Sequence, residues 1–121
     1  MKKFKANGLD GVNALCGLKE GVPFRFYRFL GEHTQEDDLH YHPNGYEYYF
    51  VIKGKILIKI NNKEIELDKN ELLIVEPGEI HAVQDVLQTC DVIIIRNEFK
   101  EQDKVSIDNK KWKVNNPVDV K

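Results

Sequence analysis

The chain has 121 residues, of which 41% are hydrophobic and 31% are charged, and its formal net charge at pH 7 is −2. This length supports a single domain, because a second one would need about 50 residues or more and a core of its own. A net charge this small provides no general attraction to nucleic acid or to an anionic membrane surface, so we expect neither as a partner.

The sequence also predicts a cytoplasmic location. The N-terminus is charged but leads into no apolar signal segment, and the longest apolar runs fall far short of the roughly 18 residues of a transmembrane helix. Cys16 and Cys90 lack the spacing of a metal or redox motif, which favours two reduced thiols over a disulfide between them.

Short apolar runs separated by turn residues predict strands and no long helix. The first strand is expected at residues 24–30, and a polar loop leads from there to a pair of histidines. The second strand is expected at residues 46–53 and ends at Gly54.

A β-hairpin is predicted in the middle of the chain. Residues 56–60 and 64–67 are apolar or alternating runs, and Asn61-Asn62-Lys63 separates them. Asparagine tolerates the left-handed backbone conformation that a tight hairpin turn requires, so these three residues are expected to form the turn.

Further strands are expected at residues 71–75, 81–83 and 91–97, each bounded by turn residues. Residues 100–104 are rich in charge and are expected to be a solvated loop, and residues 104–121 a peripheral C-terminal arm packed outside the domain. Strands spaced every 8–12 residues or so, without helices between them, favour a β-sandwich or a β-barrel.

Three of the four histidines fall in two short stretches, His40-Tyr41-His42 and Ile80-His81. In an extended strand, residues i and i+2 project from the same face, so His40 and His42 direct two imidazoles to one point. Glu47 adds an anionic oxygen and His81 a third nitrogen, a mixed donor set that suits Mn, Fe, Co, Ni or Zn. We therefore predict one divalent transition metal; ordinary core or surface histidines are the alternative interpretation.

The first of these stretches resembles the first motif of the cupin superfamily. That motif contains His-x-His, then three or four residues, Glu, six residues and Gly. His40 and His42, four residues, Glu47, six residues and Gly54 fit it, although no glycine stands at the motif's first position.

The second stretch resembles the second cupin motif, which runs Gly, five residues, Pro-x-Gly, two residues, His, three residues and Asn. Gly78 and His81 fit this pattern. Asn70 stands where the motif has its first glycine, Glu76 where it has proline, and Asp85 where it has asparagine. These departures affect turns rather than metal ligands.

The resemblance implies an all-β jelly-roll barrel in a single domain spanning residues 1–121, with His40, His42, Glu47 and His81 as metal ligands. Alternate side chains of a barrel strand point inward, so if Glu47 does, Tyr49 does too. Tyr49 is then expected to line the site with its hydroxyl. Glu47 is expected to double as a general base when it leaves the metal, a role seen in some cupins.

Proteins with similar motifs include sugar isomerases and epimerases, dioxygenases and decarboxylases. We therefore expect a small metal-dependent enzyme that acts on a carbohydrate-like or small hydroxy- or keto-acid substrate. One alternative is a non-catalytic module that binds or senses a sugar or small acid, and another is a metal that serves only as a structural clasp.

Two further expectations concern partners. Small barrels leave sheet edges that self-association can cover, and residues 24–30 offer such an edge, so we expect a homodimer. Arg25, Arg28 and Arg96 are candidates for anchoring a substrate carboxylate or phosphate, although strand arginines more often face solvent.

Overall fold

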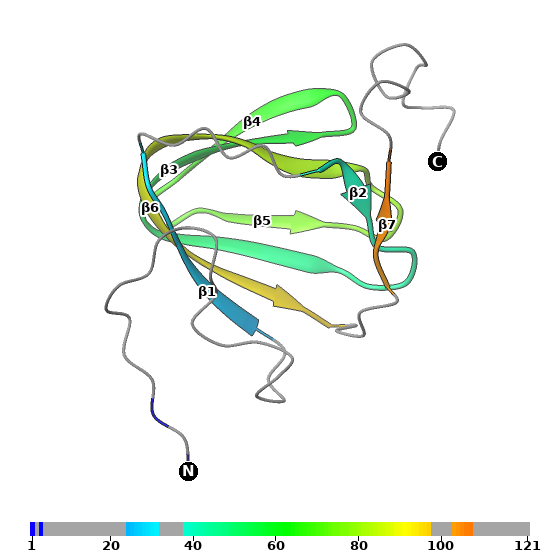
Figure 1. The fold of residues 1–121 in the computed structure, drawn as a ribbon, viewed down its shortest axis with the longest axis horizontal. Helices are drawn as coiled ribbons and strands as arrows, with labels where there is room; N and C mark the ends of the chain where they lie inside the picture. Colours follow the sequence, from blue (N-terminus) through cyan, green and yellow to red (C-terminus); the bar gives the residue numbers. More distant parts are fainter. Residues whose placement is uncertain (2, 4–23, 32–37, 98–102, 108–121) are drawn as a thin grey trace.

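The computed structural model describes residues 1, 3, 24–31, 38–97 and 103–107. These residues form seven strands and no helix, and therefore include no helix that could cross a membrane. The strands belong to one antiparallel sheet (Figure 1). They are β1 (Phe24–Phe29), β2 (His40–Tyr41), β3 (Glu47–Ile60), β4 (Lys63–Asp68), β5 (Leu72–Val75), β6 (His81–Arg96) and β7 (Val105–Ser106).

Two long strands organise the sheet. β3 has 14 residues and β6 has 16, and they pair with each other along most of their lengths. β4 and β5 pair with different parts of β3, while β1 and β2 pair with different parts of β6. Each long strand therefore pairs with one short strand near its first half and with another near its second half.

Gly54 lies at a bend within β3. Its φ is +85°, and a Cβ atom there would lie 2.0 Å from the carbonyl oxygen of Thr89, so only glycine fits. Shifts in the β3–β6 register surround this position, as expected where a strand bends. The prediction that a strand ends at Gly54 is therefore wrong. The expected strands at 81–83 and 91–97 are likewise the two ends of β6.

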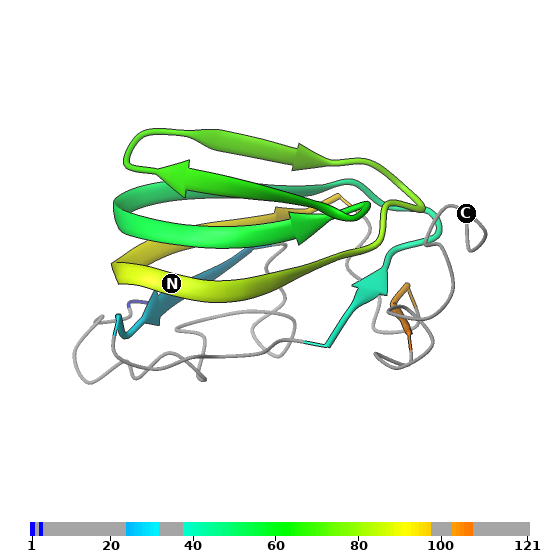
Figure 2. The same cartoon turned by 90° about the horizontal axis from the view of Figure 1, so that it is seen from above.

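The bent β3–β6 pair rolls the sheet back on itself (Figures 1 and 2). Glu47 pairs with Arg96 at one end of the ladder, and His81 pairs with Ile60 at the other end. Even so, Glu47 Oε1 and His81 Nε2 are only 2.8 Å apart. The rolled sheet confirms the predicted all-β jelly-roll architecture for the described residues, and it brings the two ends of the ladder to one site.

The interior follows the expected alternation along β3, where Glu47, Tyr49 and Val51 are buried while Phe50 is exposed. Cys90 is also a fully buried core residue with a free thiol. Burial, and then the negative charge of Asp91, raise the pKa of this thiol to about 12, which fits an inert packing role.

The predicted hairpin is confirmed, with a turn made by Asn61 and Asn62, whose φ values are 46° and 70°. Lys63, which was expected in the turn, is the first residue of β4. Asn70 also has a positive φ of 66°. It therefore adopts the conformation for which the cupin motif has a glycine, at a residue type that tolerates it.

The beginning of the C-terminal arm is part of the sheet. β7 pairs with β2, matching Val105 with Tyr41 and Ser106 with His40. The expectation of a solvated loop at residues 100–104 is wrong for Asp103, which is only 4% exposed. Residues 108–121, His33 and Cys16 lie outside the described residues.

Candidate metal centre

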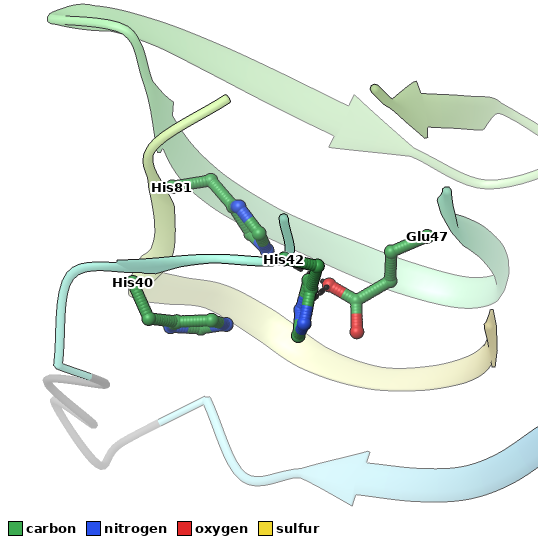
Figure 3. A group of neighbouring side chains, drawn as sticks. All are labelled: His40, His42, Glu47 and His81. Atoms are coloured by element: carbon green, nitrogen blue, oxygen red, sulfur yellow. Dashed lines mark hydrogen bonds and ion pairs between the residues drawn. The ribbon is translucent and has the colours of Figure 1, made fainter. Parts of the chain in front are cut away.

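The four residues expected to bind metal converge at one site. His40 comes from β2, His42 from the turn after it, Glu47 from the start of β3 and His81 from the start of β6. Their donor atoms all lie within 4.8 Å of one another. Figure 3 shows the three imidazoles and the carboxylate pointing toward one common point. Each of these residues is buried, with an exposed fraction of 5% or less.

The imidazole rings are held by the backbone. In each ring Nδ1 lies within hydrogen-bonding distance of a carbonyl oxygen, which can only accept. The acceptors are the oxygen of Asp38 for His40 at 2.7 Å, of Asp103 for His42 at 2.5 Å, and of Glu79 for His81 at 2.9 Å. Nδ1–H is therefore the donor in all three rings, so a neutral ring carries its lone pair on Nε2. This is the usual arrangement around histidine ligands of metals.

The inner nitrogens of His42 and His81 lack suitable partners of their own. His42 Nε2 is sealed from solvent and has no hydrogen bond. His81 Nε2 lies 2.8 Å from Glu47 Oε1, and His42 Nε2 lies 3.4 Å from the same oxygen. With Nδ1 already donating, a neutral ring would set a nitrogen lone pair against a carboxylate lone pair. A cation shared by these atoms removes that conflict, so the residues fit a metal ion.

The protonation states favour the same interpretation. Burial alone would raise the pKa of Glu47, but the neighbouring His42 and His81 rings outweigh it and hold that pKa below its usual range. Burial, and then the charge of His81, lower the pKa of His40 to about 4. At neutral pH the site therefore offers an ionised carboxylate and a His40 lone pair, the forms that bind metal.

Turn residues hold the two histidine-bearing segments together. Gly78 donates its backbone N–H to the carbonyl oxygen of His42 at 2.9 Å. Asn61 accepts from the N–H of Ile80 and donates its side-chain amide to Glu79, which fixes the backbone directly before His81. Asn61, predicted as a turn residue, therefore also positions a candidate ligand.

Asp103 is the residue that the sequence did not reveal. Its carboxylate accepts from the backbone N–H of Asn44, from the Asn44 side chain and from the N–H of Gly45, at 3.0 to 3.1 Å. Its carbonyl oxygen holds His42. It therefore fixes the turn between His42 and Glu47 from a position 61 residues away in sequence. No local pattern distinguishes it from neighbouring surface charges.

Tyr49, which was expected to line the site with its hydroxyl, also lies there. The Tyr49 hydroxyl donates to Glu47 Oε1 at 2.9 Å, and its ring lies edge-on to His81. Of the three candidate arginines, Arg28 forms a partly exposed ion pair with Asp91 at 2.7 Å. Arg96 is only 7% exposed, and its Nη1 lies 3.4 Å from His42 Nδ1.

Comparison with known proteins gives a match between residues 29–92 and the family described as "Cupin domain". The uncharacterized protein YdbB of Bacillus subtilis is 30% identical over 80 residues, which cover 65% of this chain and 68% of YdbB. The tetracenomycin polyketide synthase protein TcmJ of Streptomyces glaucescens is 33% identical over 46 residues, 38% of this chain. The match spans only 31% of the length of TcmJ.

Solved structures share the fold at low sequence identity. KdgF from Halomonas sp. superposes with a TM-score of 0.62 and 10% identity, covering 84% of this chain and 97% of KdgF. A salicylate 1,2-dioxygenase from Pseudaminobacter salicylatoxidans has a TM-score of 0.53 and 17% identity, covering 62% of this chain and 21% of the dioxygenase. These likenesses support the jelly-roll fold and leave the chemistry to the site itself.

Proposed function

Because this chain belongs to the cupin family, we propose that it is a small metal-dependent enzyme holding one divalent transition metal on His40, His42, Glu47 and His81. The observation that carries this proposal is the convergence of four buried donors whose histidine rings are each oriented by a backbone carbonyl. The mixed nitrogen and oxygen set suits Mn, Fe, Co, Ni or Zn.

The proposed substrate is carbohydrate-like or a small hydroxy- or keto-acid, and the proposed reaction is an isomerisation, an epimerisation or a dioxygenation. A metal bound here would polarise a substrate carbonyl or support dioxygen chemistry. The fold alone does not select among these reactions, since one fold hosts many chemistries. Support for the range comes from similarly folded proteins, which include a dioxygenase that is named for an aromatic hydroxy acid.

Within this proposal, Glu47 and Tyr49 are the residues that handle protons. The lowered pKa of Glu47 makes the carboxylate a good ligand but a weak base while the two histidines hold it. Tyr49 donates to the same oxygen and so orients the carboxylate. If Glu47 turns away from the histidines, its pKa rises and the Tyr49 proton becomes available to substrate.

The burial of the site favours a second candidate function, a non-catalytic module that binds a sugar or small acid. All four donor residues are almost fully buried, and His81 is 0% exposed. An enzyme needs substrate to reach the metal, whereas a metal-stabilised binding module can keep the metal enclosed.

Two experiments test these candidates. Elemental analysis of protein purified without chelator should find close to one metal per chain, and His42→Ala should lose it; a wild-type protein unable to take up metal would refute both candidates. Keto-sugars, uronates and small keto-acids are then incubated under air with the metal-loaded protein. Product formation that Tyr49→Phe slows without lowering stability supports the enzyme. Tight binding without product supports the binding module.

We also propose that the chain forms a homodimer through the outer face of the sheet. Cross-strand pairing aligns the exposed side chains of this face in two rows. In one row Leu72 pairs with Phe50. In the other row Phe24 pairs with Ile95, and Ile74 lies on the far side of β3. Each is between 36% and 55% exposed. Together they present on the order of 400 Å² of apolar surface, enough for the centre of an interface of about 800 Å² per partner.

A second copy of the chain suits this face, because a two-fold axis brings the same apolar patch of two copies together. The face differs from the edge of residues 24–30 that the sequence suggested, since β1 contributes Phe24 from its outer surface.

A further inference from the structure

The buried polar side chains of the described residues belong to one cluster. They are His40, His42, Glu47, His81, Arg96 and Asp103. Hydrogen bonds or close contacts link every one of them to the candidate metal centre. Arg96 is the one cation that is permanently charged in this group, and the metal proposal gives it no role.

Arg96 has no carboxylate partner in the part of the chain that the structure describes. Within those residues, Arg96 Nη1 approaches His42 Nδ1 at 3.4 Å. His42 Nδ1 already donates to Asp103, so it has no lone pair to accept from the guanidinium. Among the described residues, only His42 Nε2 and Gln84 Oε1 are both sealed from solvent and without a hydrogen bond. The guanidinium nitrogens of Arg96 that lack a partner therefore still reach solvent.

Because Arg96 is only 7% exposed, its side chain loses most of its hydration, and no carboxylate among the described residues offsets that loss. Such a group is expected where a ligand supplies the missing anion. The position also fits, since Arg96 is the direct cross-strand partner of Glu47 and therefore shares its inward face.

The charge balance of the site indicates what kind of anion. With the histidines neutral, the buried charged side chains Glu47, Asp103 and Arg96 leave one excess negative charge. A divalent metal would turn this into one excess positive charge. A monoanion then neutralises the loaded site, which a carboxylate does and a doubly charged phosphate does not. A carboxylate also matches the planar fork of a guanidinium.

We infer that Arg96 is the anchor for a ligand carboxylate, so that the ligand of this site is a small oxygenated acid rather than a neutral sugar. This inference rests on the proposed metal-dependent function and narrows its substrate class. The carboxylate pairs with the Arg96 guanidinium, which lies next to His42 on the inward face that Arg96 shares with Glu47.

The test compares acids with neutral counterparts by calorimetry on metal-loaded protein: glycolate against ethylene glycol, pyruvate against hydroxyacetone, and D-glucuronate against D-glucose. The wild type should bind at least one acid more tightly than its counterpart. Arg96→Met should weaken that binding by about 30-fold or more, and Arg96→Lys by less, because lysine keeps the charge but loses the fork. Binding of the neutral compounds should not change.

Arg28→Met is the matched control, because Arg28 is a strand arginine whose ion pair with Asp91 lies outside the cluster. A second readout separates a ligand anchor from a structural arginine. Without ligand, Arg96→Met should unfold at the same or a higher urea concentration than the wild type, whereas a structural arginine would make the variant less stable.

Metal content, measured on every sample, separates this inference from the proposed function. If no acid binds better than its neutral counterpart, or if metal-loaded Arg96→Met binds acids like the wild type, the inference is wrong while the metal proposal stands. If the wild type takes up no metal, the proposed function fails. The charge balance that calls for a monoanion includes the metal, so the inference then fails as well.

Discussion

Replacing Asp103 by alanine should both destabilise the fold and weaken metal binding. The substitution removes the carboxylate that accepts from the two N–H groups of Asn44 and from the N–H of Gly45. It keeps the backbone carbonyl that orients His42. The loss therefore falls on the turn that carries His42 toward Glu47, and it leaves all four candidate ligands chemically intact.

The size of the effect follows from these contacts. Hydrogen bonds to a charged acceptor contribute about 1.5–3 kcal/mol each, but Asn44 is exposed and regains water when the turn opens. We therefore expect the free energy of unfolding to fall by about 2–4 kcal/mol in total. Residues that hold a ligand in place typically change metal affinity by about 10- to 100-fold, and we expect a loss in that range.

Urea unfolding of chelator-treated protein measures the first effect, and competition with a colorimetric chelator measures the second. Glu66→Ala is the control, because the Glu66 side chain is 63% exposed. Its carboxylate oxygen Oε2 lies 4.0 Å from Lys55 Nζ. An exposed pair of this kind contributes less than about 1 kcal/mol. If Asp103→Ala bound metal as tightly as Glu66→Ala, the turn would not be what positions His42.

The other predictions concern pH, the sheet bend and assembly. The pKa of His40 is lowered from 6.5 to about 4 in the metal-free fold, so the unfolded chain takes up this proton first as the pH falls. The unfolding free energy should then drop by about 3 kcal/mol between pH 6.5 and 4, and less in His40→Gln, as measured by urea unfolding across that range. Gly54→Ala should cost more than about 3 kcal/mol through backbone clash, whereas Gly78→Ala, with the same φ of 85° but no atom within 4 Å, should cost about 1–2 kcal/mol. Light scattering should give twice the 14.1 kDa chain mass for the wild type and the chain mass for Phe50→Lys and Ile74→Lys; a wild-type monomer at micromolar concentration would refute the dimer.

Local patterns in the sequence predicted much of the fold and the four converging residues. Turn residues predicted the Asn61-Asn62 hairpin, and period-two alternation predicted the inward side chains of β3. The strand limits at Gly54 were wrong for a physical reason. Glycine is common in turns that end strands, but here a neighbouring backbone packs against Gly54 and the ladder continues through the bend.

The parts that the sequence did not predict depend on contacts between distant segments. Asp103 looks like any other charge in a polar stretch until the chain folds and brings it beneath the His42 turn. Arg96 follows an apolar run and gives no sign that it is buried without a carboxylate partner among the described residues. The role of Asp103 comes from the N–H groups that it meets in the folded chain, and the role proposed for Arg96 comes from its burial. Both depend on tertiary structure.

The departures from the cupin motif show what the motif requires physically. Asn70 replaces a glycine, yet its φ of 66° keeps the left-handed turn, because asparagine tolerates that conformation better than other residues with a side chain. Glu76 replaces proline, and there Glu79 accepts from its backbone N–H at 2.8 Å, a bond that proline cannot form. The turn before His81 therefore gains a hydrogen bond at the motif's proline position, while Pro77 supplies a rigid ring one place later. What this chain retains is the backbone path that brings His81 Nδ1 to the Glu79 carbonyl and its Nε2 to the other donors, so the turn can vary in residue type while the geometry proposed for metal binding stays fixed.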